Sequence, residues 1–191
     1  MPVASQLIAA LALVAASTAS VATQSGPVAD TSHMAPDGER VLQQTIEIDA
    51  PVERVWQAFT TTAGFRSWAA PVAVVDFRLG GIIEAAYDPK GRIGAPSNIK
   101  NEIVAYVPKR MLALRNVQAP PKLPFDAATF QRIHTVNFFE PISGSRTRVT
   151  IAQPGFRKGP AYDGVYKFFE AGNRWSLEQL KKTLEAMPAE K

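Results

Sequence analysis

The chain has 191 residues, of which 46% are hydrophobic and 20% are charged, a composition typical of one ordinary globular domain with its own core. Its net charge of +4 at pH 7 comes from basic and acidic residues scattered along the chain, without a dense basic run. This pattern argues against a nucleic-acid partner. The absence of cysteine excludes disulfides and, with two histidines, the usual nitrogen and sulfur metal sites.

The first 22 residues have the composition of a signal peptide. Residues 6–22 carry no charge, are rich in Leu, Ile, Ala and Val, and end in Ser20-Val21-Ala22, the small-x-small pattern that signal peptidase cleaves. Residues 1–6 contain no Lys or Arg, so an uncleaved anchor is the alternative, although the run is marginal for a span of about 20 residues. We expect a periplasmic or secreted protein with no stable membrane span after cleavage.

Residues 23–39 are predicted to be a flexible linker. They are rich in Ser, Thr, Pro, Asp and Gly and contain almost no bulky apolar residue, so they have little surface to bury. The folded domain is therefore expected to cover residues 40–188.

The domain begins with a strand followed by two short helices. Residues 41–48 alternate between apolar and polar, the period of a half-buried strand. Asp49 is a candidate helix cap, and Pro51 suits a first turn. Val52, Val55, Trp56 and Phe59 follow at helical spacing and form one apolar stripe, and Trp68 ends a second short helix.

Most of the chain after Trp68 is predicted to form strands. Gly80-Gly81 suits a tight hairpin between residues 72–79 and 82–87, and residues 88–98 read as a loop. With the first strand, the expected total is seven, joined mainly by short turns in an antiparallel meander. The remaining four strands are residues 99–107, 111–117, 133–139 and 147–152.

Residues 119–131 interrupt this pattern. They contain three prolines, and Asp126 is a possible cap for a short helix over residues 127–131. The segment is too long for a hairpin turn, so it is either a lid or a surface excursion without a role.

A long helix is predicted over residues 160–187. Its apolar residues follow a three-and-four spacing that is interrupted at Asn173, and a second apolar row widens the face of its first half. A helix with so broad an apolar face must lie across the sheet.

Several of these segments resemble the SRPBCC or START-like superfamily, and in particular the branch named for the C-terminal domain of the heat-shock-protein-90 ATPase activator. The segments are residues 46–59, Trp68, residues 75–78 with Gly80-Gly81, residues 147–150, Gly155-Phe156, and the final helix with Trp175, Leu177, Leu180 and Leu184. The resemblance covers residues 40–187 and implies an α+β helix-grip fold, in which a curved antiparallel sheet wraps the terminal helix and encloses an apolar cavity.

The resemblance also implies a class of ligand. Members of the superfamily bind lipids, sterols, polyketides or other hydrophobic small molecules, and a few catalyse cyclisation or hydrolysis. The chaperone-activator role is not expected here, because an exported protein meets neither a cytosolic chaperone nor ATP.

Eight residues are candidates for contact with such a ligand. Aromatic side chains on the second helix, on a late strand and on the terminal helix could form walls, and polar residues on apolar strands could anchor a ligand. His134 could act as a general base or hydrogen-bond donor if its strand face is concave; the alternative is a packed or outward-facing histidine. The candidates are Trp68, Glu84, Arg115, His134, Phe138, Tyr166, Phe169 and Trp175.

Three hypotheses for function remain open. A binding protein for a hydrophobic small molecule requires a cavity with few convergent charges. A cyclase or hydrolase requires His134 to converge with Glu84, Asp76 or Arg115 inside that cavity. An interaction or chaperone-like module requires a collapsed cavity and an exposed apolar patch. Binding is favoured, without a catalytic residue, a metal or a cofactor, and the oligomeric state is left open.

Overall fold

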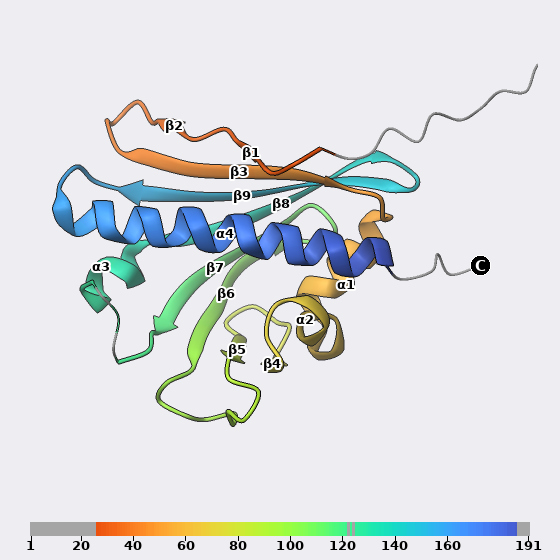
Figure 1. Ribbon diagram of the computed structural model, residues 1–191, viewed down its shortest axis with the longest axis horizontal. Helices are drawn as coiled ribbons and strands as arrows, with labels where there is room; N and C mark the ends of the chain where they lie inside the picture. Colours follow the sequence, from red (N-terminus) through yellow and green to blue (C-terminus); the bar gives the residue numbers. More distant parts are fainter. Residues whose placement is uncertain (1–25, 122, 124, 187–191) are drawn as a thin grey trace, which may run out of the picture.

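The computed structural model describes residues 26–121, 123 and 125–186. The expected signal peptide, residues 1–22, and residues 187 and 188 of the expected domain lie outside the described part of the chain. The described residues form one curved antiparallel sheet with a long helix, α4 (Pro160–Ala186), lying across its concave face (Figure 1). The expected α+β helix-grip fold is confirmed.

All seven predicted strands are present in the sheet. Their order is β3-β9-β8-β7-β6-β5-β4, and each neighbouring pair is antiparallel. β3 and β9 hold α4 at one edge, whereas β4 and β5 lie at the opposite edge (Figure 1). The bounds are β3 (Arg40–Ile48), β4 (Val72–Val75), β5 (Ile82–Ala86), β6 (Ile99–Val107), β7 (Met111–Gln118), β8 (His134–Ser143) and β9 (Arg146–Phe156).

The predicted linker is wrong for the residues just before the domain. β1 (Ala29–Asp30) and β2 (His33–Met34) pair with β3 and extend the sheet to nine strands. Val28 is buried in the main core. The edge of β3 carries backbone N–H and C=O groups that need partners, and a polar segment can supply them with its own backbone. Side-chain composition therefore gave no signal for this pairing.

Two short helices follow β3, as predicted: α1 (Val52–Thr60) and α2 (Thr62–Trp68). The expected cap of α1 is wrong, because Pro51 stands at the N-cap and no side chain caps the helix. Asp49 instead accepts a 2.6 Å hydrogen bond from Arg146. The Thr61 hydroxyl caps α2 by accepting from the backbone N–H of Gly64.

The connection between β4 and β5 is longer than the predicted two-residue turn. β4 ends at Val75, so the loop covers residues 76–81. Gly80 has a φ of 73°, and a Cβ on Gly81 would overlap the carbonyl oxygen of Asp76. Both glycines continue to pair with Ile103 of β6 through their backbone. The glycines are therefore needed for a compact loop against β6 rather than for a tight hairpin.

The C-terminal half of α4 packs on the main core. Leu177, Leu180 and Leu184 are buried there with residues of α1 and of the inner sheet face. Phe139 of β8 lies at the centre of an aromatic group, with ring centroids 5.0 Å from Phe59 and 5.5 Å from Trp56 of α1. Such edge-to-face contacts add to the free energy of burial. Aromatic and aliphatic side chains thus fill the space between this half of α4 and the sheet, and we call this part of the molecule the filled end.

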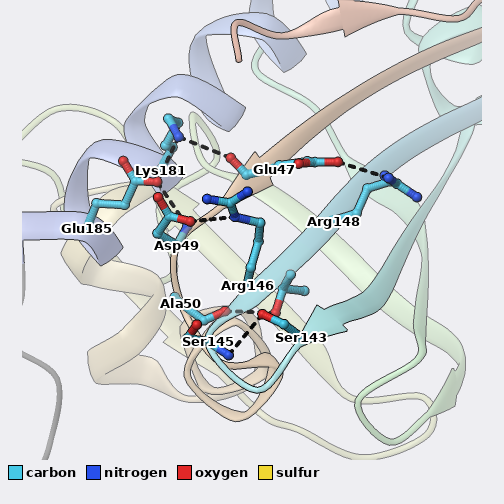
Figure 2. Close-up of polar contacts among 10 residues, drawn as sticks. Glu47, Asp49, Ala50, Ser143, Ser145, Arg146, Arg148, Lys181 and Glu185 are labelled. Carbon is cyan, nitrogen blue, oxygen red and sulfur yellow. Dashed lines mark hydrogen bonds and ion pairs between the residues drawn. The ribbon is translucent and has the colours of Figure 1, made fainter. Parts of the chain in front are cut away.

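Polar contacts hold the same end of α4 to the sheet (Figure 2). Lys181 donates to the Glu47 carbonyl at 3.1 Å and to the Glu185 carboxylate at 2.7 Å. Glu185 also accepts from the backbone N–H of Asp49 at 2.9 Å. Arg146 binds the Asp49 carboxylate beside this group (Figure 2). The last turns of α4 are thus fixed to the end of β3 and the start of β9.

Candidate functional site

A cavity of about 490 Å³ lies between the inner face of the sheet and the middle of α4, residues 168–176. Strands β6, β7, β8 and β9 form its floor, and α4 forms its roof. The described residues that line it are Tyr87, Ile99, Asn101, Asn116, Pro120, Leu123, Phe130, Ile133, Thr135, Gln153, Phe168, Phe169, Gly172, Asn173, Trp175 and Ser176. A volume of this size suits a small organic molecule.

One wall of the cavity comes from the proline-rich insertion. The predicted short helix is confirmed as α3 (Ala127–Arg132), capped by Asp126, which accepts from the Thr129 backbone N–H at 2.8 Å. Phe130 of α3 stacks on Phe169 of α4, with centroids 5.0 Å apart and an angle of 14° between the rings. Pro120 and Leu123 line the same side. The insertion is therefore part of the cavity wall.

Three aromatic residues form the rim of the cavity. Tyr87 is 58% exposed, Trp175 48% and Phe168 41%, although each also lines the cavity. Desolvation raises the pKa of the Tyr87 phenol above its ordinary value of 10.0. The rim thus exposes apolar rings to solvent beside a cavity of the same character.

A chain of uncharged polar side chains links α4 to the floor of the cavity. The Asn173 side chain of α4 donates to the side-chain amide oxygen of Gln153 at 2.9 Å. The side-chain nitrogen of Gln153, on β9, donates to the Thr135 hydroxyl of β8 at 2.8 Å. Gln153 is 1% exposed, so its two hydrogen bonds satisfy an amide that would otherwise be costly to bury. We refer to Thr135, Gln153 and Asn173 as the amide chain.

Asn116 is a second polar group in the lining. It is buried on β7, and its side-chain nitrogen donates to the backbone carbonyls of Lys100 and Gln118 and to the side-chain oxygen of Asn101. Its own side-chain oxygen is buried and has no hydrogen-bond partner in the described structure. This oxygen is therefore a buried acceptor without a donor, on a residue that lines the cavity.

Two of the eight candidate residues, Phe169 and Trp175, line the cavity. Tyr166 lies near it, packed on Phe156 at 5.1 Å beneath the guanidinium of Arg40, but is not part of the lining. Trp68 belongs to the filled end, where its indole N–H donates to the Ala58 carbonyl and its ring packs on Phe59.

The interpretation that His134, Phe138 and Arg115 face the cavity is wrong. All three are exposed, and Phe138 is 45% accessible. Arg115 pairs with Glu102 on the outer face. The inner face of β8 is formed by the alternate residues, which include Thr135 and Phe139. Both alternate sets of β8 contain apolar residues, so its pattern alone did not fix which set turns inward.

Glu84 is buried but binds a loop rather than lining the cavity. Its carboxylate accepts from the backbone N–H of Gly94 and the side chain of Asn98, both at 2.6 Å, and lies 3.6 Å from the Lys100 ammonium. Burial raises the pKa of this carboxyl, but the hydrogen bonds and the lysine outweigh it, so the pKa is lowered overall. Glu84 therefore anchors the loop of residues 88–98.

Asn116, Thr135, Gln153 and Asn173 line the cavity and were missed by the sequence interpretation. The sequence held a signal for Asn173, because it is a polar residue that interrupts the apolar spacing of α4, and in the structure it is buried. The sequence held no signal for the burial of Gln153 and Asn116, since a polar residue on an antiparallel strand more often faces solvent.

The catalytic constellation required for the enzyme hypothesis does not form. His134 and Arg115 lie outside the cavity and Glu84 is held by its loop, so these groups do not converge. Within the described ranges, no three His, Cys, Asp or Glu residues are placed to hold a metal ion. None of the helices in the described part of the chain combines the length and apolar character needed to cross a bilayer.

The comparisons place the fold among known proteins. The family model described as "Activator of Hsp90 ATPase homolog 1-like protein" matches residues 49–185. No curated protein matches the chain. The solved structure of the Aha1 dimer from Colwellia psychrerythraea is similar, with a TM-score of 0.60 at 16% identity, over 76% of this chain and 96% of that one.

Two further solved structures share the architecture. Ms6760 from Mycobacterium smegmatis has a TM-score of 0.60 at 21% identity, over 85% of this chain and 100% of that one. CalU16 from Micromonospora echinospora has a TM-score of 0.59 at 17% identity, over 88% and 80%. At these identities, the likeness concerns the fold alone.

Proposed function

Because this chain belongs to the family of Activator of Hsp90 ATPase homolog 1-like proteins, in the SRPBCC superfamily, we propose that it binds a hydrophobic small molecule in the cavity beneath α4. The observation that carries the proposal is the cavity of about 490 Å³, whose walls are mainly aromatic and aliphatic and whose floor offers a few polar groups. Ligand sites in proteins have this composition.

The alternatives receive less support. A cyclase or hydrolase that uses general acid–base chemistry needs a titratable group at the reacting atoms, and Tyr87 at the rim is the one described lining residue that titrates. The interaction-module hypothesis required a collapsed cavity, whereas this one is open beneath α4. Burial of an apolar ligand therefore explains the observed arrangement better.

A pair of matched variants tests the proposal. Phe169→Asp places a charge in the cavity wall, and Phe138→Asp places the same charge on the outer sheet face. We expect a neutral environment-sensitive naphthalene dye to bind the parent and Phe138→Asp equally. Its affinity for Phe169→Asp should fall at least about tenfold, because a buried carboxylate without a partner is costly. Equal affinity of all three folded proteins for the dye would show that it binds outside the cavity.

Native mass spectrometry addresses the natural ligand. Protein isolated gently from its own cells should carry a stoichiometric apolar adduct, which extraction would identify. A protein that is empty and also excludes the naphthalene dye would contradict the proposal.

We also propose that residues 1–22 direct export. The proposal rests on the uncharged run of residues 6–22 and the small residues that end it. Cell fractionation with N-terminal sequencing tests it: the expected product begins at Thr23 in the periplasm or medium. A chain that retains Met1 in the cytoplasm would overturn the proposal.

A further inference from the structure

The cavity is unusual in containing no charged side chain among the described residues that line it. Two acidic residues on the neighbouring strands are engaged elsewhere: Glu102 pairs with Arg115 on the outer face, and Glu84 holds its loop. The register explains the separation, because Glu102 lies opposite Arg115 whereas the neighbouring Asn101 lies opposite Asn116. Alternation along the strands sends the charged pair outward and the amide pair inward.

An anionic ligand would be poorly accommodated in this cavity. A carboxylate transferred from water into an apolar site requires an opposite charge or several hydrogen-bond donors. Among the lining residues that the structure describes there is no Lys, Arg or His. A neutral polar group, in contrast, requires one or two hydrogen bonds, which the floor can supply.

Asn116 identifies one of these hydrogen bonds. Its side-chain nitrogen lies 3.2 Å from the Lys100 carbonyl and 3.0 Å from the Gln118 carbonyl. Because backbone carbonyls only accept, these contacts fix which end of the amide is the nitrogen. The remaining oxygen is therefore an unpaired acceptor, and it is buried, so a small shift of the side chain must accompany any contact with a ligand donor.

The amide chain supplies the second polar contact. Thr135 carries a hydroxyl, and the two amides of Gln153 and Asn173 link it to α4. The hydroxyl can rotate and both amides can reverse together, so the chain offers the cavity either a donor or an acceptor. A ligand group that can do both, such as a hydroxyl or an amide, suits this floor.

We propose that the ligand of this cavity is a neutral molecule with an apolar body and a hydroxyl or amide group, which donates to Asn116 and meets the amide chain at Thr135. Asn116 is then the residue that determines specificity, and fatty acids and other carboxylates are excluded. This inference rests on the proposed binding function and adds the chemical class of the ligand.

A matched series of probes tests the inference. Naphthol, naphthamide, methoxynaphthalene and naphthoate, all substituted at the same ring carbon, share one apolar body and differ in donor capacity and charge. We expect the parent protein to bind naphthol and naphthamide at least about tenfold more tightly than methoxynaphthalene or naphthoate, measured by titration calorimetry. Tighter binding of naphthoate, or equal binding of all four, would overturn the inference while leaving the binding function intact.

Two near-isosteric variants locate the contacts. In Asn116→Leu, the preference of naphthol over methoxynaphthalene should fall to within about twofold, while the affinity for methoxynaphthalene is kept. Asn116 also ties two backbone segments, so Thr135→Val provides a second variant that should lose part of the same preference. An unchanged preference in either folded variant contradicts that residue's contact. Failure of all four probes to bind the parent would instead reject the binding function itself.

Discussion

The two halves of α4 lie on the same sheet but differ in what packs beneath them. The second half packs on the rings of α1 and on Phe139, and Leu177 and Leu180 are buried almost completely. Residues 168–176, in the middle of the helix, border the cavity, whereas Val165 near its start packs with Leu42 and Phe156 in a second, smaller core. The difference lies in what packs beneath the helix: α1 and its aromatic stripe pack under the second half, whereas the insertion with α3 forms one wall of the cavity.

The comparison shows how a helix-grip fold separates stability from binding. The filled end stabilises the position of α4 on the sheet, because aromatic rings, leucines and the polar contacts of Figure 2 act together there. The cavity end can remain open because the helix is already fixed at its other end. We therefore expect substitutions at the two ends to affect different measurements.

The largest expected effect is on the free energy of unfolding. Leu180→Ala removes a buried side chain from the filled end and should cost about 2–5 kcal/mol, because the surrounding core cannot collapse into the space. Phe169→Ala should cost less than half as much, since its ring borders existing space. Urea unfolding monitored by circular dichroism measures both. An equal loss of unfolding free energy at the two positions would mean that the cavity end stabilises the fold as much as the filled end.

The next effect is on binding alone. Gly172 and Gly164 both lie within α4 with open space around them, but only Gly172 is among the described residues that line the cavity. Replacing either glycine by leucine improves helix propensity, so neither change should lower stability. Gly172→Leu should weaken binding of the naphthalene dye at least about tenfold by occupying its space, and Gly164→Leu should not. A similar affinity for both variants would place the dye outside the cavity.

The fold was largely predictable from the sequence, because the spacing of apolar residues differs between strands and helices. The alternation in residues 41–48 and the three-and-four spacing of residues 160–187 identified β3 and α4 almost to the residue. β1 and β2 escaped prediction because strand pairing at a sheet edge uses the backbone, and the side chains of residues 29–34 carry no apolar pattern.

The candidate site was less predictable than the fold, because strand patterns do not specify which face becomes concave. In β8, His134 and Phe138 were candidates for the inner face, which is in fact occupied by Thr135 and Phe139. A shift of one residue reverses every assignment on a strand. On α4, by contrast, the wide apolar arc placed Phe169 near the cavity, since a helix face can be read without knowledge of its partner.

A third prediction concerns pH and the loop beside the cavity. The pKa of Glu84 is lowered in the folded protein from its ordinary value of 4.5, so the folded state holds its proton less tightly than the unfolded state. The stability from this carboxylate is therefore present above that value and lost as pH falls through the folded pKa. Glu84→Gln should cost about 1–2 kcal/mol near neutral pH. It should also flatten the loss of stability below about pH 5.

Glu102→Gln is the matched control for this prediction. Glu102 pairs with Arg115 on the outer face, and a surface pair of this kind contributes at most about 1 kcal/mol. Urea unfolding of both variants across the acid range separates the two cases. If the two variants show the same pH dependence, the loop anchored by Glu84 does not stabilise the domain.

The smallest effect belongs to the polar contacts at the filled end. Lys181→Met removes the donor to the Glu47 carbonyl and to Glu185, and should cost less than about 1 kcal/mol because these groups are partly exposed to water. The cost should shrink in high salt, which screens the charges. Lys182→Met is the control, since Lys182 has no ion pair in the described ranges. Neither change should alter dye affinity, because both residues lie beyond the part of α4 that borders the cavity. A weaker affinity in Lys181→Met alone would instead show that the anchored end of α4 controls the shape of the cavity, and that the two halves of the helix are energetically coupled.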